Sequence, residues 1–122
     1  MRTGKIKIGD KEYLGCFSTR VLANVEDYTG MSFETGLKDI LEKKSIKEII
    51  WFVSQLINAG DRYAKMEGID NPGTLDEDEI YDIVGVDDYE DVFGSIGDIV
   101  KAGTKPEIEL KPTKNAKATQ GK

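Results

Sequence analysis

The sequence predicts a mainly α-helical α+β domain of about five helices, with a β-hairpin at its N-terminus and a disordered basic tail after it. Three observations support this prediction. Residues 5–8 alternate lysine and isoleucine, which is typical of a half-buried strand. Between residues 19 and 102, apolar residues recur at helical spacing. After Gly103 this pattern ends, so we expect a folded domain over 1–103 and a disordered, Lys-rich tail over 104–122.

The N-terminal segment predicts a hairpin over residues 4–17. Gly9 and Asp10 follow the first alternating run, and this pair suits a tight two-residue turn. Residues 11–17 can then return as the second strand. A lone hairpin is only marginally stable in water, so we expect this one to pack on the helices or to pair with another chain.

Capping and stop signals divide the rest of the chain into helices. Serine, threonine and aspartate begin helices because their side chains accept hydrogen bonds from the first backbone amides, and glycine often ends them. We expect capping boxes at Ser45 with Glu48 and at Thr74 with Glu77, and we expect Gly103 to end the last helix. By these signals the helices span residues 19–29, 33–43, 46–66, 75–84 and 88–102.

The segment 46–66 is predicted to be the central helix of the core. It carries the longest apolar stripe at helical spacing, and Gly60 falls on that stripe. A glycine inside a helix costs about 1 kcal/mol of helix propensity. We therefore expect another element to cross the helix closely at Gly60.

Charge argues against two classes of partner. The net charge is −6, and residues 68–99 hold 11 carboxylates without a lysine or arginine. An acidic body repels nucleic acid phosphates and anionic membranes, so we expect neither as a partner. No uncharged apolar run is long enough to span a bilayer, and no apolar stretch follows the N-terminal basic residues, so a cytoplasmic protein is expected.

The residues that most often perform catalysis are missing. The chain has no histidine and one cysteine, which removes the commonest general base, the serine and cysteine triads and most zinc sites. We interpret Cys16 as a buried small hydrophobe. Starting at Asp76 or Asp87, the acidic clusters fail the spacing of a calcium-binding loop. The sequence therefore predicts no enzyme, no catalytic residue, no cofactor, no metal and no small-molecule substrate.

Binding to another protein is the remaining function. Amphipathic helices can present part of an apolar stripe to a partner helix. Aromatic side chains on or beside these stripes are the candidate partner-binding residues, although residues of this kind more often belong to the core. These candidates are Trp51, Phe52, Tyr63, Tyr89 and Phe93.

The order of short patterns resembles a known family. It runs from YLGCF at 13–17, through TRVLANVE at 19–26 and a glycine at position 30, to a hydrophobic helix that ends in INAG at 57–60. In this order the chain is similar to the tail assembly chaperones of long-tailed bacteriophages, in the versions found in phages and prophages of Gram-positive bacteria. The similarity covers roughly residues 5–103.

The resemblance implies a function in virion morphogenesis. Such chaperones bind the tape measure protein, a very long helical chain, and keep it soluble in the bacterial host cytoplasm while tail tube subunits polymerise around it. The implied partners are therefore the tape measure protein and, as a second partner, the tail tube protein. Family members can also form homo-oligomers, for which the hairpin offers a strand edge.

Three alternatives remain open. The chain could be a structural morphogenesis component such as a head–tail connector, which would be present in the finished virion. It could be an acidic inhibitor that mimics DNA, which would need its charges at phosphate-like spacing on one face. An enzyme would have to rely on carboxylates or lysines alone.

Overall fold

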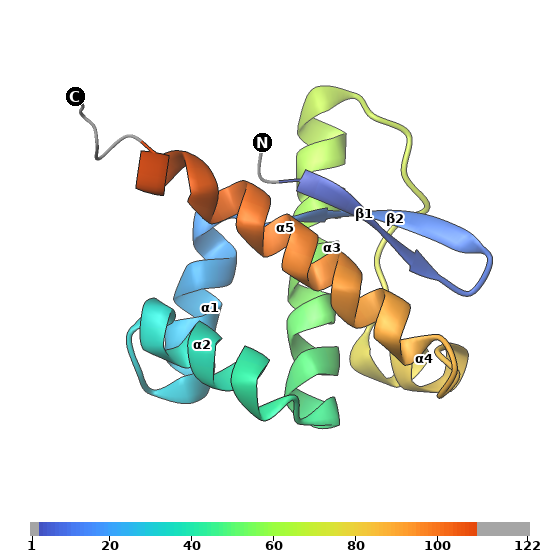
Figure 1. The fold of residues 1–122 in the computed structure, drawn as a ribbon. Helices are drawn as coiled ribbons and strands as arrows, with labels where there is room; N and C mark the ends of the chain where they lie inside the picture. The colour runs from blue at the N-terminus through green and yellow to red at the C-terminus, as the bar shows by residue number, and fades with distance from the viewer. Residues whose placement is uncertain (1–2, 110–122) are drawn as a thin grey trace.

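The computed structural model describes the backbone of residues 3–109 and the side chains of residues 3–101. Its elements, in chain order, are β1 (Thr3–Ile8), β2 (Lys11–Cys16), α1 (Thr19–Thr29), α2 (Phe33–Lys43), α3 (Ile46–Glu67), α4 (Glu77–Ile83) and α5 (Tyr89–Glu109). The predicted α+β class, with five helices behind an N-terminal hairpin, is confirmed. Helix α3 forms the centre; α1 and α2 lie on one side of it, the hairpin lies on the other, and α5 crosses α3 diagonally (Figure 1).

All seven elements contribute to one core. Residues of the α3 stripe are buried together with side chains from both strands and from the other four helices. Burial of this apolar surface is the main favourable term in folding. The largest fully buried side chains are Phe52, Ile6, Ile40, Ile49, Leu56, Ile57, Ile80, Ile96, Ile99, Val21 and Val25. None of the described helices is both long enough and apolar enough to cross a membrane.

The hairpin is held between two helices. Its antiparallel register pairs Ile6 with Tyr13, and both side chains are buried, whereas Lys5 and Lys7 on the opposite face are exposed. The buried face lies against α5, where Ile99 packs over the paired glycines Gly4 and Gly15. Strand β2 also contacts α3. The expectation that the hairpin packs on helices is therefore confirmed.

Helix α3 crosses β2 at Gly60. A β-carbon built on Gly60 would lie 1.8 Å from the backbone oxygen of Leu14 and 2.9 Å from the Cα of Gly15. Only a residue without a side chain fits between the helix and the strand at this point. The prediction of a close crossing is confirmed, and β2 is the element that crosses.

A hydrogen-bonded network closes the outer edge of β2 beside that crossing. The backbone N–H of Leu14 donates to Oδ1 of Asn71 at 2.9 Å, and Nδ2 of Asn71 donates to Oδ1 of Asp61 at 3.1 Å. Lys65 pairs with the other oxygen of Asp61 at 3.1 Å. Asp61 is 6% exposed, so its carboxylate is a buried charge with partners on both oxygens. The network ties the loop between α3 and α4 to the hairpin.

Removing the charge of Asp61 is expected to flatten the pH dependence of stability. The hydrogen bond from Asn71 is the main reason that the pKa of Asp61 lies below its usual value, and Lys65 adds to the effect. Because the pKa is lower in the folded state, the carboxylate stabilises the fold above its unfolded pKa, and this contribution is lost as the pH falls below that value. We expect Asp61→Asn to cost about 1 kcal/mol at neutral pH.

Urea unfolding at neutral pH and near pH 3 measures this effect. The stability of wild type should approach that of Asp61→Asn as the pH falls. Asp98→Asn removes an exposed carboxylate of α5 and serves as the matched control. A constant gap between wild type and Asp61→Asn over this range would contradict the assignment.

Two helix ends differ from the sequence prediction. Helix α4 begins two residues later than expected, because Asp76 rather than Thr74 is its cap. Asp76 Oδ1 accepts from the amide of Glu79 at 2.8 Å, and Glu79 Oε1 accepts from the amide of Asp76 at 2.9 Å. The buried pair Leu75 and Ile80 flanks this cap, which is the spacing of a hydrophobic staple. The box predicted at Ser45 with Glu48 is also wrong. Ser45 caps α3 by position without a side-chain bond.

The last helix passes the glycine that was expected to end it. Helix α5 continues through Gly103 to Glu109, so residues 104–109, assigned to the tail, have helical backbone. Glycine ends a helix only where it adopts the left-handed conformation, and in a helix interior it is tolerated at about 1 kcal/mol. Residues 110–122, the rest of the predicted disordered tail, lie outside the described residues.

Candidate functional site

The five aromatic candidates do not form one surface. Phe52 lies in the core with 0% of its surface exposed, and its ring meets that of Phe17 edge to face at 6.3 Å. A partner cannot reach it in this conformation. The other four are partly buried, and they lie in three separate places.

Trp51 forms a stacked pair with a residue that sequence reasoning missed. The rings of Trp51 and Tyr28 lie 3.9 Å apart at an interplanar angle of 11°, and Tyr28 is an exposed residue of α1. Burial, followed by the negative charges of Glu48 and Glu77, raises the pKa of the Tyr28 hydroxyl. The pair therefore sits beside the acidic start of α4.

A groove of about 340 Å³ opens between the start of α3, helix α4 and the start of α5. We call it the α4 groove. Its lining is mostly apolar, and three of the side chains reach well into solvent: Ile46 at 59%, Tyr81 at 41% and Val86 at 96% exposed. Among the sequence candidates, Tyr89 lines this groove. Contiguous exposed apolar surface of this kind marks interaction sites.

The polar groups around the α4 groove are acidic. Glu90 lines it, and the first turn of α4 carries Glu77, Asp78 and Glu79. Burial and the neighbouring Glu90 raise the pKa of Tyr89, whose hydroxyl oxygen is buried without a hydrogen-bond partner among the described residues. The groove thus combines an apolar lining with neighbouring carboxylates.

Phe93 lies one turn further along α5 but has a different neighbour. Its ring is 6.4 Å from that of Tyr89, and Nζ of Lys44 lies 5.2 Å from its centroid. A lysine at this distance is attracted by the ring. Phe93 therefore packs against the edge of the core and also makes a cation–π contact with Lys44.

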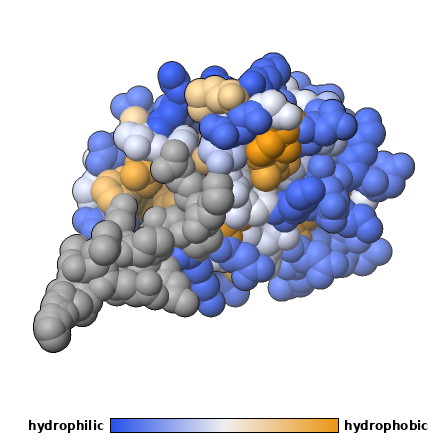
Figure 2. All heavy atoms as spheres, turned by 90° about the horizontal axis from the view of Figure 1, so that it is seen from above, coloured by the Kyte–Doolittle hydropathy of each residue, from blue (hydrophilic) through white to orange (hydrophobic). Residues whose placement is uncertain are grey.

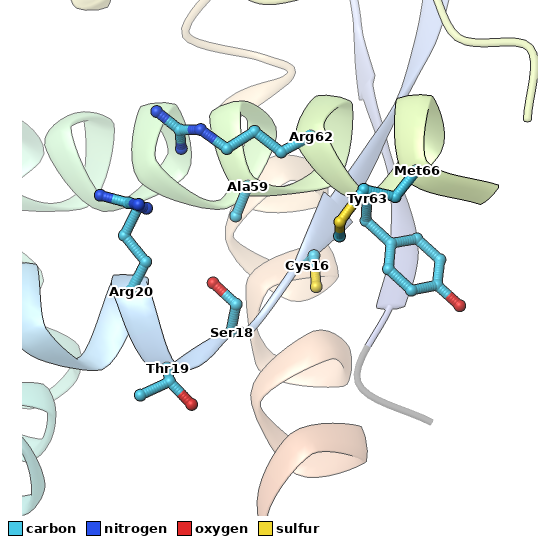
Figure 3. Close-up of a pocket in the computed structure, with 8 residues that line it drawn as sticks. All are labelled: Cys16, Ser18, Thr19, Arg20, Ala59, Arg62, Tyr63 and Met66. Carbon is cyan, nitrogen blue, oxygen red and sulfur yellow. The ribbon is translucent and has the colours of Figure 1, made fainter. Parts of the chain in front are cut away.

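Tyr63 lines a second opening, at the other end of α3 (Figure 3). This cleft has a volume of about 360 Å³ and lies between α1, the end of β2 and α3. We call it the Arg cleft, because Arg20 of α1 and Arg62 of α3 both line it. Met66 flanks it and is 76% exposed.

Seen from the side shown in Figure 2, the surface is largely hydrophilic, with separate hydrophobic patches.

Exposed residues that the sequence candidates omit define these surfaces. Ile46, Tyr81 and Val86 lie at a helix start, on a short helix and in a connection, where helical periodicity gives little guidance. One signal was available. Val86 is an apolar residue in the short connection between the last two helices, directly before two aspartates, and such connections lie on the surface.

Among the described residues, no three carboxylate or thiol side chains lie close enough together to hold a metal ion. The arrangement offers contact surfaces of defined shape and charge. Neither protein-family models, nor curated proteins, nor solved structures match this chain.

Proposed function

We propose that this protein is a non-enzymatic tail assembly chaperone of a long-tailed bacteriophage. In this role it binds the tape measure protein and keeps it soluble while the tail tube assembles. The proposal rests on the resemblance in the order of sequence patterns, and the α4 groove is the observation on the structure that supports it best. A chaperone that keeps another protein soluble needs an accessible apolar contact surface, and it must not aggregate itself.

The α4 groove has the character that an amphipathic helix requires. A helix docks through apolar side chains spaced three and four residues apart, which enter a hydrophobic groove. Ile46 and Val86 are aliphatic and exposed, so a partner that covers them gains about 25 cal/mol for each Å² removed from water. The tape measure protein, a long helical chain, supplies such stripes repeatedly.

The acidic surroundings suit the same role. Negative charge around the groove keeps chaperone molecules apart, and it disfavours contacts with acidic proteins. Glu90 at the groove and the three carboxylates of the first turn of α4 favour a partner helix with lysine or arginine beside its apolar stripe.

Co-expression with fragments of the candidate tape measure protein tests the proposal. The double variant Ile46→Ser and Val86→Ser keeps the fold, because both side chains are exposed, and removes the apolar anchors. We expect it to lose at least about tenfold in affinity, which corresponds to 1.4 kcal/mol. Ile69→Ser changes an exposed isoleucine outside both openings and is the matched control.

Two results would contradict the proposal. One is a wild-type chain that neither co-purifies with any fragment nor raises its solubility. The other is the chain in purified virions, detected by mass spectrometry, because a chaperone leaves the finished particle whereas a connector stays in it.

A further inference from the structure

We infer that the Arg cleft binds a carboxylate-bearing segment of a partner protein, in which an aspartate or glutamate stands beside an apolar residue. This is a second surface, distinct from the α4 groove, and the inference does not depend on the function proposed above. It rests on charge, shape and the position of the two arginines.

The two arginines of the cleft are accessible to a ligand. The chain has three arginines and 23 acidic residues, and two of the three line this one cleft. Both Arg20 and Arg62 are exposed, and neither guanidinium forms an ion pair or hydrogen bond with another described residue. In Figure 3 the two side chains come from α1 and α3 and lie at the same side of the opening.

Nearby carboxylates are directed elsewhere. None of the described residues that line the cleft is acidic. Asp61 precedes Arg62 in sequence, and the charge of Arg62 contributes to the lowered pKa of Asp61, but both oxygens of Asp61 are already bound by Asn71 and Lys65. The first turn of α1 carries no acidic residue. The local charge at the cleft is therefore positive on a protein whose net charge is −6.

The guanidinium group selects the ligand. Its planar fork matches a carboxylate in a bidentate arrangement, which a lysine ammonium cannot reproduce. Between the arginines and the far wall lie Ala59, Tyr63 and the exposed Met66, which offer apolar surface. A volume of about 360 Å³ accommodates an acidic side chain with an apolar neighbour.

Nucleic acid is the less favourable anionic ligand. Its backbone presents a continuous row of phosphates, and the acidic body around the cleft repels that row. A short acidic peptide presents its charge only where the arginines lie. Ala59 and Arg62 are 13 and 16 residues beyond Ile46 on α3, which places the cleft about 20 Å from the start of the α4 groove, so both surfaces can be occupied together.

NMR titration of the isotope-labelled full chain tests the inference. The probe is a blocked pentapeptide of alternating leucine and glutamate, and its counterpart carries glutamine for glutamate. We expect saturable amide shifts at Arg20, Arg62 and Tyr63 with the acidic peptide below about 10 mM, and none with the glutamine peptide.

Variants separate bidentate recognition from general charge. Arg20→Gln with Arg62→Gln should weaken binding at least about tenfold, and Arg20→Lys with Arg62→Lys should fall between this pair and wild type. Lys11→Gln with Lys47→Gln removes the same charge from exposed positions elsewhere and should change binding less than about twofold.

Any of four results would overturn the inference. They are an acidic peptide that gives no saturable shift at the cleft, equal binding of the glutamine peptide, equal weakening by the lysine control, and tighter binding of inorganic phosphate. Concentration-dependent shifts of the same amides in the free chain would also overturn it, because a second copy would then be the occupant.

Discussion

Replacing Gly60 by alanine is expected to lower the free energy of unfolding by about 3 kcal/mol or more, although alanine is the better helix former. The new methyl group would lie 1.8 Å from the backbone oxygen of Leu14. A side chain could rotate away from such a clash, but a strand backbone cannot. Either α3 moves away from β2 or the strand shifts, and both changes open the core. Urea unfolding followed by circular dichroism measures the loss.

Gly94→Ala is the matched control for this prediction. Gly94 also lies within a helix, and no described atom outside that helix comes within 4 Å of a β-carbon built on it. Here alanine should raise the stability by up to about 1 kcal/mol. If the two substitutions change stability in the same direction, the close crossing at Gly60 is not what limits that position.

Phe52→Ala is expected to cost about 3–5 kcal/mol, the range for a large aromatic side chain removed from a core. Phe52 is fully buried and packs on Phe17, so truncation leaves a cavity and removes the edge-to-face contact. Its neighbour Trp51 is only partly buried, and Trp51→Ala should cost distinctly less. Thermal and urea unfolding of the two variants measure the difference.

Phe52→Leu keeps most of the apolar volume and should recover much of the loss. A Phe52→Ala protein as stable as wild type that fails to bind its partner would contradict the core assignment. That result would place Phe52 on the partner surface, which the sequence analysis named as the alternative to the core.

The sequence predicted the elements well because their signals are local. The alternation at residues 5–8 and the stripe of α3 depend on neighbours within a turn or two. Gly60 was informative for a related reason. A poor helix former on the buried stripe needs a compensating contact, although the identity of β2 as that contact was not predictable.

Contacts between distant residues explain what the sequence did not predict. The hydrogen bond between Leu14 and Asn71 joins residues 57 positions apart, and no local sequence pattern predicts it. The α4 groove is formed by three elements whose relative placement depends on the whole core. Asp76 and Thr74 can both cap a helix, so local sequence alone does not decide between them. The buried pair Leu75 and Ile80, which flanks the cap, favours Asp76.

The position of the hairpin has a consequence for how this protein is made. Ile99 of α5 packs on the buried face of the hairpin. Because α5 follows the hairpin by about 80 residues, the hairpin is synthesised long before this contact can form. Contacts between residues so far apart in sequence form slowly. Until then the face of the hairpin that carries Ile6 and Ile8 lacks its cover from α5, and exposed apolar surface of this kind makes a nascent chain prone to aggregate.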